Sequence, residues 1–246
     1  MFYTSPLMAR QGIRAVFSDR QGGVSQGAFE SLNLGFGLGD EDAHVRHNLH
    51  MLCQKAGMPS PHQARQVHGT QVLVCSGAGK HHEQDADILI AREQGVALAV
   101  RTADCLPVLL ADKQAGVIAA VHAGWRGTVA RVVEQALARM LAYGAEVERI
   151  QASLGPCIAP CCFAVSDDVA EQLCDACSQN VTLHQDGKTY ADLAKANHVQ
   201  LLSFGVNAEN IELSRHCTAC CKQPGFFSYR RDKGKTGRQL SMICLS

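Results

Sequence analysis

Three short segments of this chain each place a side chain suited to metal binding at the end of an apolar run. They are residues 66–69, 102–107 and 121–127, which carry His68, Cys105 and His122. These side chains lie much further apart in the sequence than the closely spaced Cys pairs of a structural zinc knuckle. Only a folded sheet can bring them together, so we expect strands that end at a shared edge.

The apolar runs themselves have the length and composition of buried strands. Each is short and partly β-branched, with Asp, Gly or Pro at its edges. Early strands are predicted at residues 13–18, 71–75, 86–90, 97–102, 107–111 and 117–122. Later ones are predicted at 149–154, 211–214 and 239–244.

Helices are predicted where the apolar spacing changes to three and four residues. This holds for 127–143, ended near Gly144, and helices are also predicted at 167–177 and 191–204, the last closed by Gly205. The Gly-rich stretch 22–39 is interleaved with Phe and Leu, which indicates an ordered loop. Together these patterns predict an α/β or α+β fold with mixed sheets in a single domain, residues 1–246.

Composition excludes several classes of function. Lys plus Arg number 23 and Asp plus Glu number 23, so no net charge would draw the chain to nucleic acid or an anionic membrane. No run approaches ~18 consecutive apolar residues, so no membrane span is expected. The first residues lack the pattern of a signal peptide, which favours a cytoplasmic location with the 12 cysteines as free thiols or metal ligands. The oligomeric state is left open.

Two imidazoles and one thiolate suit Zn²⁺, and catalytic zinc sites use three protein ligands with the fourth position open. His68, Cys105 and His122 form such a set. Each alone could equally be a hydrogen-bonded or packed core residue. Cu²⁺ binds such ligands more tightly than Zn²⁺, so copper stays possible, although no Met follows His122 as a blue-copper axial ligand would.

Further motifs run in order from about residue 18 to the end of the chain. They are Ser-Asp-Arg-Gln-Gly-Gly-Val-Ser at 18–25, Ser-Leu-Asn-Leu-Gly at 31–35, Leu-Gly-Pro-Cys-Ile at 154–158, Cys-Thr at 217–218, Phe-Phe-Ser-Tyr-Arg-Arg at 226–231 and Thr-Gly-Arg at 236–238. With the three metal-ligand segments, this series resembles the YfiH-like, laccase-domain family. That family is known both as multicopper polyphenol oxidases and as zinc-dependent purine nucleoside phosphorylases.

The resemblance implies a layered α/β/β/α sandwich and a metal held by His68, Cys105 and His122. It also implies phosphorolysis of adenosine, inosine and methylthioadenosine, and hydrolytic deamination of adenosine, with purine nucleosides and phosphate as partners. A laccase-like copper oxidase of phenols is one alternative. Another is a thiol hydrolase or amidase, linked to peptidoglycan precursor editing, with Cys105 as nucleophile and His122 as base.

Other candidate catalytic residues are less specific. Zinc deaminases use a carboxylate for proton transfer, and Asp104 could serve, although it could equally be a turn former; Asp87 is a weaker candidate. Phosphate favours Arg side chains and helix starts, which points to Arg126 or, failing that, Arg20 and Arg230-Arg231, any of which could simply be solvated. Trp125 could stack on a base or pack in the fold.

A second metal site is a further possibility. Two Cys pairs, Cys174 with Cys177 and Cys217 with Cys220, have the spacing of a zinc knuckle. The first pair falls within a predicted helix, where both thiols fit equally well as small apolar side chains. Spacing alone is weak evidence, so this site stays an open alternative.

Overall fold

The computed structural model describes residues 1–223 and 225–245, and its largest unit is a mixed sheet of six strands. In spatial order the strands are β14 (Ile211–Leu213), β10 (Gln151–Leu154), β8 (Leu106–Asp112), β9 (Val117–Ala123), β6 (Ile88–Ala91) and β4 (Val72–Cys75). The outer pairs β14–β10 and β6–β4 are parallel and the inner pairs are antiparallel. Because β8 and β9 are buried along their whole length, this sheet lies inside the molecule.

A second, four-stranded sheet packs against the first. Its order is β1 (Phe2–Thr4), β2 (Ile13–Ser18), β15 (Gln239–Leu245) and β7 (Ala97–Thr102), all antiparallel. Alternate residues face opposite sides of a strand, so Leu109 and Ile118 of the first sheet meet Phe17, Val100 and Ile243 of the second. The two sheets therefore share one buried apolar layer.

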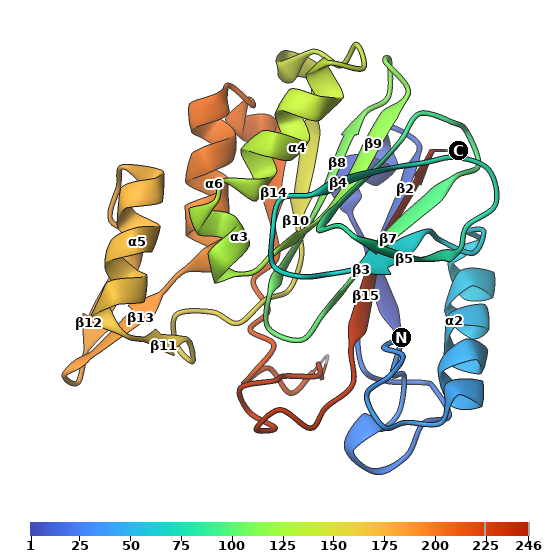
Figure 1. Ribbon diagram of the computed structural model, residues 1–246, viewed down its shortest axis with the longest axis horizontal. Coiled ribbons are helices and arrows are strands. Elements are labelled where there is room, and N and C mark those ends of the chain that lie inside the picture. Colours follow the sequence, from blue (N-terminus) through green and yellow to red (C-terminus); the bar gives the residue numbers. More distant parts are fainter. Residues whose placement is uncertain (224, 246) are drawn as a thin grey trace.

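Helices cover both outer faces, which completes the α/β/β/α order (Figure 1). On the six-stranded side α4 (Val132–Leu141) buries its apolar face, and α6 (Leu193–Phe204) packs beside it. On the four-stranded side Leu52 of α2 (Asp42–Ala56) packs on Val16 and Met242. The fold predicted from the sequence is thereby confirmed.

Smaller elements flank this core. A three-stranded sheet lies beside α5 (Asp167–Cys177), and a parallel pair of short strands precedes the site described below (Figure 1). The remaining bounds are α1 (Pro6–Arg10), α3 (Trp125–Val129), β3 (Gln63–Arg65), β5 (His81–Asp85), β11 (Ala164–Val165), β12 (Thr182–Gln185), β13 (Lys188–Ala191) and three 3-10 turns, η1 (Gly27–Phe29), η2 (Val147–Arg149) and η3 (Ala208–Asn210).

One predicted helix is wrong in its extent. The expected helix over 127–143 is two helices, α3 and α4, separated at Arg131, which has a left-handed φ of 58°. A non-glycine residue at this φ interrupts helical geometry. Arg126 therefore lies in a helix of five residues, α3, and not at the start of a long one.

The described residues contain no helix that is both long and apolar enough to cross a membrane. All twelve cysteines are free thiols. The loop predicted over 22–39 is ordered, with Phe29, Leu32 and Leu34 buried.

Candidate metal centre and cavity

His68, Cys105 and His122 come together at the ends of strands. Cys105 directly precedes β8, His122 is the sixth residue of β9, and the two strands pair, so the thiol and imidazole are neighbours. His68 lies on the loop between β3 and β4. One ligand atom from each of the three lies within 4.8 Å of the others, and Cys105 Sγ is 3.8 Å from His68 Nε2.

Two of the segments turn sharply to place these side chains. His68 has a φ of 62° and Asp104, just before Cys105, a φ of 94°. Non-glycine residues adopt this left-handed region at a cost and mostly where the surroundings hold them there. The surroundings here are hydrogen bonds to two buried carboxylates, Asp87 and Asp104.

Asp87 organises the histidines. It is fully buried, and its carboxylate accepts hydrogen bonds from the backbone N–H of Val67, His68 and Gly69 at 3.2, 3.0 and 2.8 Å. Its Oδ1 also accepts from His122 Nδ1 at 2.7 Å. With Nδ1 bonded to Asp87, Nε2 is the His122 nitrogen left to interact with Cys105. The sequence underrated Asp87, since its partners are distant in the chain.

Electrostatics favour a charged pair at Cys105 and His122. Burial raises the pKa of the Cys105 thiol, but the adjacent His122 and His68 lower it by more, so the net shift is downward. Burial lowers the pKa of His122, yet Cys105 and Asp87 raise it overall. The sulfur is thus held as a thiolate, the form that binds metals or attacks electrophiles.

Asp104 links the segment before Cys105 to two distant parts of the chain. Its Oδ1 accepts from Thr218 Oγ1 at 2.7 Å, and its Oδ2 accepts from the backbone N–H of Arg230, also at 2.7 Å. Both oxygens of this carboxylate therefore already have partners, one of them a hydroxyl and the other an amide. Asp104 joins the segment before β8 to the segments that carry Thr218 and Arg230.

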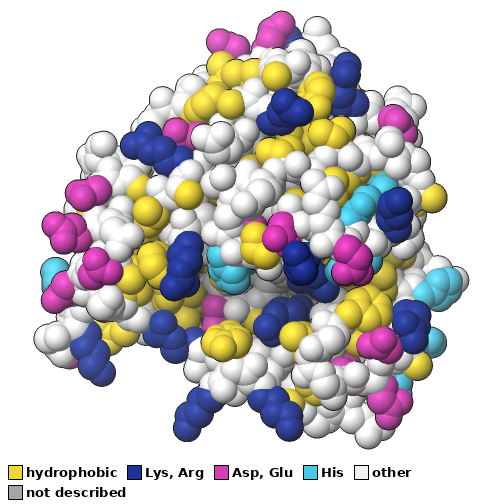
Figure 2. Space-filling view, in the orientation of Figure 1, with side chains coloured by type: hydrophobic (Ala, Val, Ile, Leu, Met, Phe, Trp, Pro, Cys, Tyr) yellow, Lys and Arg dark blue, Asp and Glu magenta, His cyan; other side chains and the backbone are white. Residues whose placement is uncertain are grey.

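The three side chains open into a cavity of about 580 Å³. Five arginines line it: Arg65, Arg101, Arg126, Arg230 and Arg238. Apolar and aromatic side chains line it as well: Phe36, Leu38, Ile158, Phe163 and Tyr229. Figure 2 shows Lys and Arg side chains gathered around a hollow in the middle of one face. This mixture of cationic and apolar side chains suits a small molecule that has an anionic part and an apolar part.

The predicted arginines do not all belong here. Arg126 and Arg230 line the cavity, whereas Arg20 and Arg231 line a separate hollow. Arg126 is exposed and its guanidinium lies 4.3 Å over the Trp125 ring. This guanidinium hydrogen-bonds to none of the described residues, so it is available to a ligand. Trp125 is not among the lining residues and packs against the core.

Sequence reasoning missed Arg101 and did not single out Arg238. Arg101 lies in the otherwise buried strand β7, and a charged residue in an apolar run was the available signal. Burial lowers the pKa of both guanidiniums, and the two also repel each other. Both side chains are half-buried, and an anion would stabilise two such cations that lie close together.

The sequence was also compared with known protein families and with individual proteins. The sequence pattern of a family described as multi-copper polyphenol oxidoreductase laccase matches residues 14–246. The chain belongs to this laccase-domain family. A purine nucleoside phosphorylase of Deinococcus radiodurans is 40% identical over 231 residues, covering 93% of this chain and 88% of the relative. Adenosine deaminase RL5, from an unknown prokaryotic organism, is 37% identical over 251 residues, 95% and 94% of the two chains.

Solved structures of the laccase-domain family share the fold. The crystal structure of Bacillus licheniformis hypothetical protein YfiH aligns with a TM-score of 0.87 at 27% identity, covering 96% of this chain and 94% of that one. The resemblance to YfiH-like proteins that the motifs indicated is thereby confirmed.

Proposed function

We propose that the chain is a zinc-dependent purine nucleoside phosphorylase that also deaminates adenosine. Adenosine, inosine and methylthioadenosine are its proposed nucleosides. The observation that carries this proposal is the convergence of two imidazoles and a thiolate on a cavity lined by five arginines. The names of the relatives, purine nucleoside phosphorylase and adenosine deaminase, support the same assignment. Twelve unpaired thiols favour the cytoplasm as its compartment.

The residues present fit a zinc ion. The three ligand atoms lie within 4.8 Å of one another, and Cys105 Sγ is 3.8 Å from His68 Nε2, which is close to the spacing of two ligands on one ion with bonds of about 2.0–2.3 Å. A histidine ligand commonly donates its other N–H to a carboxylate, as His122 does to Asp87. When bound, Zn²⁺ would act as a Lewis acid that polarises a substrate atom or activates water. The lining residues among those described include no Met, which argues against a blue-copper geometry.

The cavity residues divide between the two parts of the substrate. Arg126, Arg230 and Arg238 supply positive charge for phosphate. Phe163 and Tyr229 offer ring surfaces for a purine. A volume of about 580 Å³ is within the range of small-molecule sites.

We assign Asp104 a positioning role. Thr218 and the backbone N–H of Arg230 already donate to the two oxygens of Asp104. Protonation of this carboxylate would weaken these hydrogen bonds, which hold the cavity wall together. Proton transfer by Asp104 stays the competing prediction.

A thiol hydrolase is the second candidate, and one observation favours it. Cys105, His122 and Asp87 follow one another as nucleophile, base and orienting carboxylate, the order used in thiol catalysis. A chelator would leave such an activity intact, whereas it would abolish a metal-dependent one.

The direct test incubates protein of known metal content with adenosine and phosphate and identifies the products. Phosphorolysis gives adenine and ribose 1-phosphate, and deamination gives inosine and ammonia. Omitting phosphate should remove only the first pair. Protein purified without added copper should contain zinc and be active. Activity that appears only after copper loading, with a phenol as substrate, would favour the oxidase instead.

Cys105→Ala separates the two enzyme classes. It removes the anionic member of the three proposed ligands, so the zinc bound at this site and nucleoside turnover should both be lost while the fold, followed by circular dichroism, survives. A variant whose zinc content equals that of the unmodified protein but whose activity is lost would make the thiol a nucleophile. One that keeps both would exclude Cys105 from the site.

A further inference from the structure

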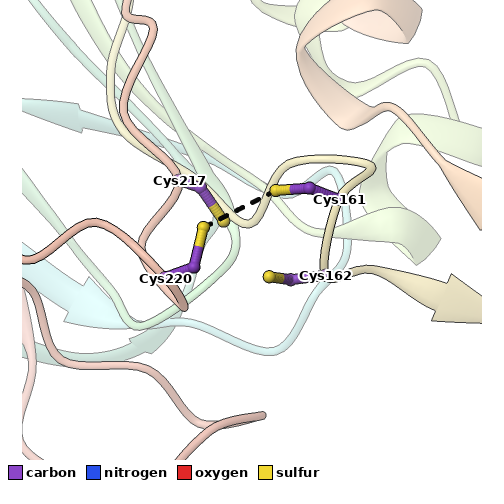
Figure 3. Close-up of side chains that lie close together, drawn as sticks. All are labelled: Cys161, Cys162, Cys217 and Cys220. Carbon is purple, nitrogen blue, oxygen red and sulfur yellow. Dashed lines mark hydrogen bonds between the residues drawn. The ribbon is translucent and has the colours of Figure 1, made fainter.

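Four cysteines outside the cavity form a second cluster. Cys161 and Cys162 lie in a turn between β10 and β11, and Cys217 and Cys220 lie in a turn after β14. Figure 3 shows the four side chains drawn together from these two turns. Their sulfur atoms all lie within 4.8 Å of one another.

The sulfur spacing suits a shared ion. Four thiolates around Zn²⁺ at about 2.3 Å form a tetrahedron whose edges are about 3.8 Å. Cys161 Sγ and Cys220 Sγ are 3.7 Å apart. A disulfide would require about 2.05 Å, and all four residues are free thiols.

Hydrogen bonds of the backbone hold the two turns against each other. Cys157 and Cys217 form a β-bridge, and the N–H of Thr218 donates to the carbonyl of Cys157 at 3.0 Å. The N–H of Ala159 donates to Cys217 Sγ at 3.3 Å, and such a bond orients a thiolate ligand. The cluster is therefore built into the loop structure and is not a chance approach of flexible side chains.

A positive side chain lies beside the second turn. Arg231 donates to the carbonyls of Thr218 and Ala219, at 3.2 and 3.5 Å. Four thiolates and one Zn²⁺ leave a net negative charge, which this guanidinium partly offsets.

We propose that Cys161, Cys162, Cys217 and Cys220 bind a zinc ion as a closed, structural tetrathiolate site. None of the four is among the cavity-lining residues described above, so this ion would be distinct from the proposed catalytic one. Four protein ligands leave no open position for a substrate, which is typical of structural zinc.

The site would cross-link two walls of the cavity. The turn of Cys161 lies between Ile158 and Phe163, which both line the cavity. The turn of Cys217 carries Thr218, which donates to Asp104. Tetrathiolate zinc would thus fix the distance between these two walls.

The test measures metal content in full-length protein carrying Cys105→Ala, a background in which the proposed catalytic site is disabled. This background should retain about one zinc per chain, as expected for a closed site. Adding Cys161→Ser and Cys220→Ser should reduce zinc to below a tenth of that. Cys221→Ser is the matched control, because Cys221 lies next to Cys220 but outside the cluster, and it should leave zinc unchanged.

X-ray absorption at the zinc edge of the Cys105→Ala protein needs no cluster variant, so it stays informative if the serine variants fail to fold. Sulfur-only coordination supports the proposal. Zinc that is bound by nitrogen or oxygen, iron in place of zinc, or a metal-free Cys161–Cys220 disulfide seen as a two-dalton mass loss would each overturn it. If this site fails while Cys105→Ala still removes zinc and activity, the proposed function stands.

Discussion

At the scale of single residues, Gly124 packs closely against two of the three proposed ligands. A Cβ at this position would lie 2.8 Å from His68 Cδ2 and 3.0 Å from Cys105 Sγ. Gly127, three residues on, has its nearest neighbour at 3.4 Å, Val132 Cγ1, which is ordinary contact. The two glycines therefore form a matched pair in one motif.

We expect Gly124→Ala to displace His68 or Cys105 and to weaken metal binding. Overpacking costs about 1–3 kcal/mol, which corresponds to about a five- to 150-fold loss of affinity. Gly127→Ala should stay within about threefold of the unmodified chain by the same scale. Competition with a fluorescent zinc chelator measures both. Equal affinities in the two variants would mean that the site adjusts freely or that the metal lies elsewhere.

A second substitution, at Arg126, can separate phosphate binding from the other functions of the cavity. A charge-assisted bond to phosphate is worth about 1.5–3 kcal/mol, so Arg126→Ala should raise KM for phosphate about ten- to 150-fold. Deamination uses water and should change little. Arg139→Ala is the control, because Arg139 also lies over an aromatic ring, Tyr143, but not in the cavity.

Steady-state kinetics of both reactions in each variant give the answer. Equal loss of phosphorolysis and deamination would mean that Arg126 supports the fold or the metal. No loss of either would move attention to Arg230 and Arg238, since Arg20 lies outside the cavity.

At the scale of elements, a buried carboxylate joins β8, the β8–β9 turn and the start of η2. Asp112 is fully buried and accepts from the backbone N–H of Ala115 and of Glu146, both at 3.0 Å. Arg149 pairs with it at 3.1 Å. Burial raises the pKa of Asp112, but these donors lower it by more, so the net shift is downward.

Because its pKa is lower in the folded state, Asp112 stabilises the fold above its unfolded pKa of about 3.9 and loses this effect as pH falls through the folded pKa. Asp112→Asn should therefore lower the free energy of unfolding near pH 7 by about 1–3 kcal/mol. The difference should shrink below about pH 4.

Urea unfolding across this pH range measures the effect. Asp186→Asn is the control, because Asp186 is an exposed turn residue before Gly187 at a left-handed φ that Asn also tolerates. A pH-independent difference for Asp112→Asn would mean that Asp112 is uncharged or that shape alone matters.

Elements were predictable where a local pattern decided them. The strands at 13–18 and 97–102 and the helix at 167–177 match the structure, because apolar runs or apolar periodicity end there at turn residues. The proposed ligands His68, Cys105 and His122 were singled out because each closes such a run. Their convergence needed only the pairing of β8 with β9 and a loop nearby.

Elements held by distant contacts were missed. Helix α2 has a thin apolar stripe, and its buried face includes Asn48, which bonds to Ser25, Ser31 and Asn33 of the Gly-rich loop. The interruption at Arg131 has no local signal, since any residue can be forced to that φ. Cys161 and Cys162 are adjacent, so their spacing gave no hint of the partners Cys217 and Cys220.

At the scale of the whole molecule, charge is balanced overall and unbalanced locally. The chain has equal numbers of acidic and basic residues, 23 of each, yet five arginines line one cavity. Such a field acts over a short range and attracts small anions without drawing the protein to polyanions.

Salt should therefore affect one reaction more than the other. Raising KCl from ~0.05 to ~0.5 M shortens the screening length severalfold, so KM for phosphate should rise several-fold. Adenosine is uncharged, and its deamination should change by less than about twofold. Initial rates with sucrose at equal osmolality are the control. A parallel rise in both KM values would mean that salt acts on the fold or the metal.

The position of β15 has a consequence for synthesis. This strand lies between β2 and β7 and pairs with both, although β7 ends at Thr102 and β15 begins at Gln239. During synthesis β2 and β7 leave the ribosome long before β15, the strand that pairs with both. Until β15 is made, the apolar residues of β2 and β7 stay exposed to solvent. Sheets closed by such distant pairing form slowly. We expect nascent chains that end before β15 to be the ones that chaperones hold and proteases cut.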